Sequence, residues 1–324
     1  MSLEFDHFIG LNSLFQGAIF HPDGIKYIFT AGANVVVGDL IDPHLQHFLR
    51  GHDDAVTSVA LSSRGRLIAS GQRGERSDVL VWDYESRQQL YRFEEHDGQI
   101  ISLAFSDDEK ILASLGADGN MILWDMSNGC IIVSTSKLPQ GTCVAAFAGF
   151  IRDIKRRDTS HYQLCTAGED GVTIWDIDPY NGEMVPFKLQ GDVRATLTRH
   201  VTALSFSDDR EYLFAATTSG DYLIANFKSQ RILKSVQATK MALHTIMTHG
   251  DRIVIGCGDK TIKIYGPNGE YLNEVKLDGA IVGLTMSPDK LEVRGVFHVF
   301  LYLNSHLVGI GNNFLWFNSS SELK

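Results

Sequence analysis

The stretch HFLRGHDDAVTSVALSSRGRLIASGQRGERSDVLVWDY (47–84) decides the fold of this chain. Apolar and polar residues alternate in its short runs, and the turns between them are rich in Gly, Ser and Arg. Such alternation is typical of β-strands with one buried face. Within the stretch, His52 precedes the Trp of Trp82-Asp83 by 30 residues. It therefore predicts one antiparallel unit of several short strands.

The same unit returns along the chain. Trp124-Asp125 and Trp175-Asp176 follow at steps of 42 and 51 residues, and His96 precedes Trp124 by 28. A period of about 40–45 residues, with His early and Trp-Asp late, is typical of the blades of a β-propeller. Seven blades of roughly 42 residues need about 290 residues, which nearly fills the 324 of this chain.

Other copies of the unit have lost the Trp. Gly38-Asp39 stands at that position in blade one, Asn226-Phe227 in blade five and Tyr265 in blade six. A seventh blade begins at AIVGLTMSPD (280–289). We therefore expect an all-β propeller over residues 1–293, with six recognisable blades, the start of a seventh and an atypical last blade.

The segment 294–324 departs from the repeat. It carries no charged residue from Val296 to Ser321. A membrane span would leave its histidines, asparagines and serines unpaired in hydrocarbon, so two or three irregular strands that complete blade seven are favoured. A tail that is foreign to the fold is the other interpretation.

Composition narrows the function. The chain has 29 basic and 39 acidic residues, a net charge of −10, which disfavours nucleic acid and suits a neutral or basic protein partner. No two of the four cysteines form a Cys-x-x-Cys pair, so reduced thiols are expected, and MSLEFDHFIG (1–10) lacks the pattern of a secretory signal. Both features favour the cytoplasm, and we expect no membrane association.

Two blades contain a Ser/His/Asp set that resembles a hydrolase triad. A triad is needed once, whereas a structural hydrogen-bonded brace is needed in each blade, so the repetition favours the brace. We expect no catalytic residue, and therefore no enzyme. The expected brace residues are His52, Ser70, Asp78 and Trp82 in blade two; His96, Ser114, Asp118 and Trp124 in blade three; and Thr166, Asp170 and Trp175 in blade four.

No cofactor or metal site is expected. The glycine-rich turns lack the Lys-Ser/Thr that follows a phosphate loop, and the cysteine spacing matches no zinc site. A small-molecule substrate is not expected either. The one basic cluster is Arg152, Lys155, Arg156 and Arg157, in an insertion in the first hairpin of blade four. It is either a solvated hairpin tip or a protein-binding surface for an acidic partner.

The Trp-Asp units resemble WD repeats. LEFDHFIGLN (3–12), the blade-two stretch with its insertion before DVLVWDY (78–84), ATTSGDYL (216–223) and KLDGAIVGLTMS (276–287) occur in an order that resembles the N-terminal half of the cilia- and flagella-associated WD-repeat family that lines the lumen of doublet microtubules. The resemblance covers roughly residues 3–293. Members of that family carry two propellers, and the tail from Arg294 resembles none of their segments, so a truncated or alternatively spliced form is one interpretation.

The resemblance implies a non-enzymatic microtubule inner protein of the ciliary or flagellar axoneme, with tubulin and other luminal proteins as partners. The alternative is a soluble WD-repeat adaptor, such as a ubiquitin-ligase substrate receptor. Receptors of that kind often carry Arg two residues after the Trp-Asp aspartate. Here those positions hold Glu85, Ser127 and Asp178, which disfavours the alternative.

Overall fold

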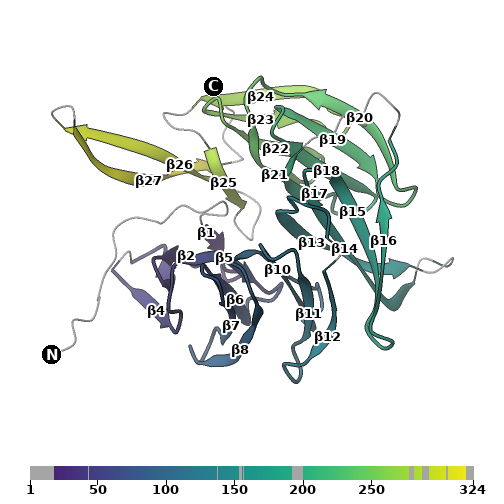
Figure 1. The fold of residues 1–324 in the computed structure, drawn as a ribbon. Helices are drawn as coiled ribbons and strands as arrows, with labels where there is room; N and C mark the ends of the chain where they lie inside the picture. Colours follow the sequence, from purple (N-terminus) through teal and green to yellow (C-terminus); the bar gives the residue numbers. More distant parts are fainter. Residues whose placement is uncertain are drawn as a thin grey trace, which may run out of the picture.

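The computed structural model describes residues 18–42, 44–136, 138–152, 155, 157–191, 200–276, 281–286, 292–303 and 306–318. In these ranges all regular elements are β-strands, and they form six four-stranded sheets and one three-stranded sheet. Consecutive strands pair antiparallel, so each sheet is built from one continuous piece of chain. The sheets stand side by side around a central axis (Figure 1). The all-β propeller predicted from the repeat is confirmed.

The first three sheets follow the predicted blades, because each apolar run becomes a strand and each Gly-rich or Asp-rich segment a turn. Their strands are β1 (Ala18–Phe20), β2 (Lys26–Ala31), β3 (Asn34–Asp39), β4 (Gln46–Arg50), β5 (Val56–Leu61), β6 (Leu67–Gln72), β7 (Ser77–Asp83), β8 (Gln89–His96), β9 (Ile100–Phe105), β10 (Ile111–Gly116), β11 (Met121–Asp125) and β12 (Ile131–Thr135).

Blade four has the longest hairpin of the six four-stranded sheets. The strands of blades four to six are β13 (Val144–Arg152), β14 (Asp158–Gly168), β15 (Gly171–Asp178), β16 (Glu183–Lys188), β17 (Val201–Phe206), β18 (Tyr212–Thr217), β19 (Asp221–Asn226), β20 (Arg231–Gln237), β21 (Leu243–His249), β22 (Arg252–Cys257), β23 (Thr261–Tyr265) and β24 (Tyr271–Lys276). The insertion expected at 151–162 continues the strands: β13 and β14 stay paired, with two register shifts, out to Arg152 and Asp158.

The last sheet contains β25 (Ile281–Met286), β26 (Glu292–Leu303) and β27 (His306–Asn318). β26 and β27 pair along almost their full length and extend outward from the ring (Figure 1). β25 lies between β21 and β1, so the innermost strands of all seven sheets follow one another around the axis. Residues 3–12 and 319–324 lie outside the described ranges. No helix within those ranges is long and apolar enough to cross a membrane.

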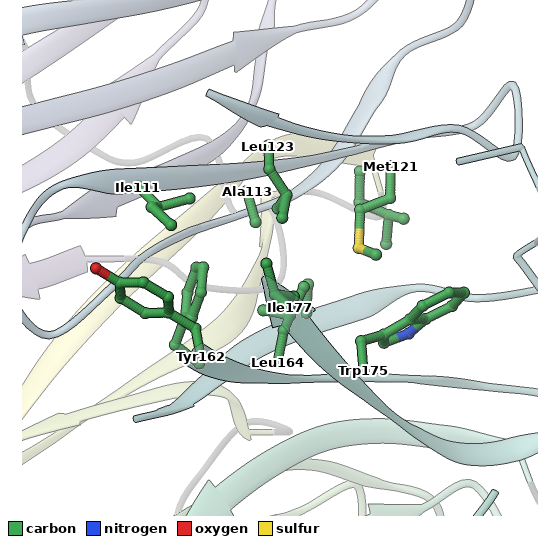
Figure 2. Packing of buried hydrophobic residues seen from close by; sticks show 11 residues of the cluster. Ile111, Ala113, Met121, Leu123, Tyr162, Leu164, Trp175 and Ile177 are labelled. Carbon is green, nitrogen blue, oxygen red and sulfur yellow. The ribbon is translucent and has the colours of Figure 1, made fainter. Parts of the chain in front are cut away.

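The hydrophobic core lies between the blades. In the layer between blades three and four, Leu123 and Met121 from one sheet face Leu164, Ile177 and Trp175 from the other (Figure 2). Similar layers join blades two and three, four and five, and five and six. The sheets of blades three, four and five are therefore buried on two faces, which explains why their middle strands are almost continuously apolar.

A central cavity of about 580 Å³ runs inside the ring, and all seven innermost strands line it. Three polar side chains on or directly before these strands each donate to a backbone carbonyl of the next blade. The links are Thr57 Oγ1 to Ile100 O (2.6 Å), Cys143 Sγ to Val201 O (3.1 Å) and Thr202 Oγ1 to Leu243 O (2.7 Å). Burial raises the pKa of Cys143 to about 11, so the thiol keeps the proton that this link requires.

Candidate functional site: blade braces and a basic hairpin

Blade three holds a chain of four side chains. The Trp124 indole N–H donates to Ser114 Oγ at 2.8 Å, and Ser114 Oγ lies 2.8 Å from His96 Nε2. His96 Nδ1 lies 3.4 Å from Asp118 Oδ2. A neutral His96 satisfies every contact, since its Nδ1–H donates to Asp118 and its Nε2 accepts from the Ser114 hydroxyl. Burial lowers the pKa of His96, and the Asp118 carboxylate opposes that shift without cancelling it.

Blade two has the same first three members. Ser70 Oγ lies 2.9 Å from Trp82 Nε1 and 2.7 Å from His52 Nε2. The fourth member is Gln72, whose Oε1 lies 2.8 Å from His52 Nδ1. Burial lowers the pKa of His52, so this chain is also neutral at physiological pH.

Asp78 was expected as the fourth member in blade two, and the structure corrects that expectation. Its carboxylate pairs with Arg92 on β8, which also reaches Asp53 at 3.1 Å. Gln72 occupies the strand position in blade two that Gly116 occupies in blade three. Gln72 pairs with Val56, and Gly116 pairs with the equivalent residue, Ile100.

Gly116 explains why blade three can use an aspartate. A Cβ at that residue would lie 2.4 Å from both Asp118 Oδ1 and His96 Nδ1. The absence of a side chain therefore leaves room for the carboxylate to reach the imidazole from the following turn. In blade two the Gln72 side chain fills the corresponding space and makes the contact itself.

Blade four keeps only the first hydrogen bond of this series, the one from the Trp to a hydroxyl group. Trp175 Nε1 donates to Thr166 Oγ1 at 2.8 Å, and both residues are buried. A Cβ at Gly168 would lie 2.1 Å from Gly141 O. The backbone at Gly141 therefore fills the space next to Thr166. Asp170 is exposed in the turn between β14 and β15, away from this bond.

Blade five has a different brace that the sequence analysis missed. Asp221 is 2% exposed and accepts hydrogen bonds from Thr217 Oγ1 and Ser235 Oγ, both at 2.6 Å. Asp221 is the first residue of β19, the third strand of blade five. In blade two, Asp78 occupies the equivalent position near the start of β7. The available signal was a Thr four residues before an Asp across a tight hairpin, in a blade that has no Trp.

The two triad-like sets share one geometry, which does not suit a nucleophile. Ser70 and Ser114 are fully buried, and each hydroxyl contacts both an indole and an imidazole of its own blade. Among the described residues, no group of three or more His, Cys, Asp or Glu is placed to hold a metal ion.

The basic cluster lies on the long hairpin of blade four, residues 150–162, which we call the basic hairpin. Arg152 ends β13 and pairs with Asp158 on β14, with Nε 3.1 Å from Oδ1. Lys155 and Arg157 are exposed, and Arg156 lies outside the described residues. Arg152 stands on the last residue of β13, whereas Lys155 and Arg157 lie in the connection between β13 and β14.

A cavity of about 600 Å³ separates the basic hairpin from the turns of blade five. Phe150 and Phe227 contribute to its lining, together with Arg152, Arg210 and Lys228. The cavity also contains acidic groups, so its walls are mixed in charge.

Arg210 ties three blades together beside this cavity. Its guanidinium Nη2 lies 3.1 and 3.0 Å from the two carboxylate oxygens of Asp107 in blade three. Its Nη1 donates to Phe147 O in blade four at 3.0 Å. Because Nη2 contacts blade three while Nη1 contacts blade four, one guanidinium from blade five links the turns of the three blades.

Comparison with known proteins agrees with this architecture. The model of the WD domain, G-beta repeat family matches residues 43–83, 87–125 and 191–224. Two solved structures share the fold: U3-55K, with a TM-score of 0.71 and 16% identity over 94% of this chain and 95% of that one, and the RRP9 WD40 repeats, with 0.69 and 16% over 90% and 88%. The chain is a WD-repeat β-propeller, a class whose members are typically non-enzymatic scaffolds for protein–protein interaction.

Its curated homologues include Cilia- and flagella-associated protein 52. The protein of that name from Chlamydomonas reinhardtii is 33% identical over 285 residues, which cover 84% of this chain and 44% of the relative. The human protein is 29% identical over 314 residues, or 92% and 47%. These similarities confirm the resemblance found in the sequence. The chain spans less than half the length of these relatives.

Proposed function

We propose that this chain is a non-enzymatic structural scaffold of the ciliary or flagellar axoneme, a microtubule inner protein that stabilises doublet microtubules. The observation that carries the proposal is the similarity to Cilia- and flagella-associated protein 52, which extends over 84–92% of this chain. The chain's localisation to cilia or flagella belongs to the same proposal.

The architecture suits a scaffold because its stiffness comes from contacts between neighbouring blades. Apolar layers, inner-strand links and the Arg210–Asp107 tie all join one blade to another. A rigid platform holds its surface loops at fixed separations. It therefore binds a repeating lattice without the entropy cost of ordering these loops.

The basic hairpin supports contact with an acidic partner such as tubulin. The chain carries a net charge of −10, yet Arg152, Lys155 and Arg157 gather at the end of one hairpin. Long-range repulsion from the rest of the surface then orients an acidic partner toward this hairpin. The brace residues take no part in this contact and serve the stability of the blades.

The test is expression of the tagged chain in a ciliated cell, followed by isolation of axonemes and stepwise salt extraction. We expect the chain to remain with doublet microtubules after the soluble matrix is removed. Charge reversal of the basic hairpin, R152E/K155E/R157E, should release it at lower salt. The matched control is R73E/R76E, which reverses two exposed arginines in the turn between β6 and β7 of blade two.

Recovery of the wild-type chain entirely in the soluble matrix would contradict the proposal. Purification dominated by ubiquitin-ligase subunits would favour the soluble adaptor instead. Equal release of the two reversed variants would contradict the role of the basic hairpin while leaving the scaffold role intact.

A further inference from the structure

A serine follows the basic cluster on β14. The sequence reads Lys155-Arg156-Arg157-Asp158-Thr159-Ser160, so Arg157 stands three residues before Ser160 and other basic residues precede it. Many Ser/Thr kinases select substrates by basic residues shortly before the target hydroxyl, since these pair with acidic groups in the kinase cleft. Two adjacent hydroxyls, Thr159 and Ser160, meet this requirement.

The structure distinguishes the two hydroxyls. Thr159 is half-buried, its Oγ1 donates to Ile151 O at 2.7 Å, and it accepts from His161 N at 3.2 Å. Modification of Thr159 would break both bonds near the outer end of the β13–β14 pair. Ser160 is exposed on the same strand. Its hydroxyl is therefore accessible to an enzyme where that of Thr159 is not.

We propose that Ser160 is a phosphorylation site for a basophilic Ser/Thr kinase, and that its phosphate weakens the basic hairpin's contact with an acidic partner. In the reaction, Ser160 Oγ loses its proton and forms a bond to the γ-phosphorus of ATP as the bond to the β-phosphate oxygen breaks, which releases ADP. The second half of the proposal rests on the proposed function of the basic hairpin.

The electrostatic consequence follows from position. Side chains alternate along a strand, so Ser160 shares a face of β14 with Asp158, the partner of Arg152. A phosphoserine carries a charge of about −1.5 to −2 at neutral pH. Added beside Asp158, it offsets about half to two-thirds of the combined positive charge of Arg152, Lys155 and Arg157. The phosphate accordingly acts on the partner and leaves the blade intact.

The first experiment is phosphorylation of the full chain by the catalytic subunit of cAMP-dependent protein kinase with ATP, followed by mass spectrometry of the intact protein and its peptides. We expect one phosphate at Ser160, lost in Ser160→Ala. Thr159→Val keeps the shape of the side chain and should retain the phosphate. Absence of phosphate from Ser160, or its appearance at Thr159 instead, overturns the proposal.

The second experiment measures binding to poly-L-glutamate, a probe for an acidic surface, at low and moderate salt. Phosphorylation should weaken binding of the wild-type chain by about fivefold or more, and should leave kinase-treated Ser160→Ala unchanged. Unchanged binding after verified phosphorylation overturns the switch alone. If the unmodified chain fails to bind the probe, the acidic-partner role of the basic hairpin fails with it, whereas the phosphate at Ser160 stands on the mass measurement.

Discussion

Blades two and three complete the same hydrogen-bond chain with different last residues. In blade two, Nδ1 of His52 contacts the neutral amide of Gln72. In blade three, Nδ1 of His96 contacts the carboxylate of Asp118. The difference arises from one strand position, occupied by Gln72 in one blade and Gly116 in the other. A buried imidazole needs a partner for each nitrogen, and the neighbouring side chain decides which residue supplies it.

The largest effect is expected where the two blades agree. Trp124→Ala should lower the free energy of unfolding by about 3–5 kcal/mol, because it removes a buried ring stacked on Phe93 and leaves a cavity. Chemical denaturation followed by far-UV circular dichroism measures the change. Trp124→Phe retains much of the packing but removes the N–H donated to Ser114 together with part of the ring, so its cost should be smaller, about 1–2 kcal/mol. Equal costs would show that the hydrogen bond dominates the packing.

The next effect tests the strand position that separates the blades. Gly116→Ala should cost about 1–3 kcal/mol, since the new methyl group overlaps Asp118 and His96. The double variant G116Q/D118G gives blade three the residues of blade two and should recover part of the loss. Thermal unfolding of both variants measures this. A double variant less stable than Gly116→Ala would disprove the equivalence of the two positions.

A smaller contrast checks the fourth member of blade two. Gln72→Ala should cost about 1–2 kcal/mol because it leaves His52 Nδ1 buried without its partner. Asp78→Ala removes a buried carboxylate but leaves Arg92 its pairs with Asp53 and Glu94, so it should cost at most about 1 kcal/mol. Unfolding of the two variants side by side gives the ranking. The reverse order would restore Asp78 to the brace.

The smallest effect is in pH dependence. Burial holds the pKa of His96 below the unfolded value of 6.5, so the unfolded chain binds more protons just below that pH and stability falls as pH drops from about 6.5. Asp118→Asn removes a charge that raises this pKa, so the fall between pH 7.5 and 5.5 should deepen by a few tenths to about 1 kcal/mol. The carboxylate of Asp118 itself has a lowered pKa and titrates below this window.

Gln72→Glu is the matched variant for that measurement. It places a carboxylate beside His52, raises the pKa of that imidazole and should make the acid loss of stability shallower. Free energies of unfolding at the two pH values test both variants. Shifts of the same sign would contradict the assignment of these two partners.

Much of the fold could be predicted because the repeat is written in alternation and turn residues. The runs ending in Trp82, Trp124 and Trp175 gave strands of the expected order, and blades one, five and six kept the same layout without the Trp. The extended strands of the basic hairpin were harder to foresee. Polar residues on both faces hide the alternation at 151–162, although backbone pairing continues through Arg152 and Asp158.

The braces show where the prediction failed. Ser, His and Trp were identified from spacing, but Asp78 stands four residues before its Trp and Asp118 stands six before. The serine-to-Trp distance also differs, at 12 residues in blade two and 10 in blade three. Those offsets indicate hairpins of different length, in which an aspartate cannot occupy the same place. The contribution of Gly116 depends on close approach in three dimensions, which spacing does not reveal.

The inner-strand links have a consequence for how the ring carries load. Thr57, Cys143 and Thr202 each join one blade to the next one only, around the central cavity. An outward pull on blade five is therefore shared with blades four and six, and a pull on blade two with blade three. Loss of one of these hydrogen bonds weakens one contact between blades and leaves the other two intact. These links hold blades with and without Trp-Asp alike, because blades two to four carry it whereas blades five and six do not.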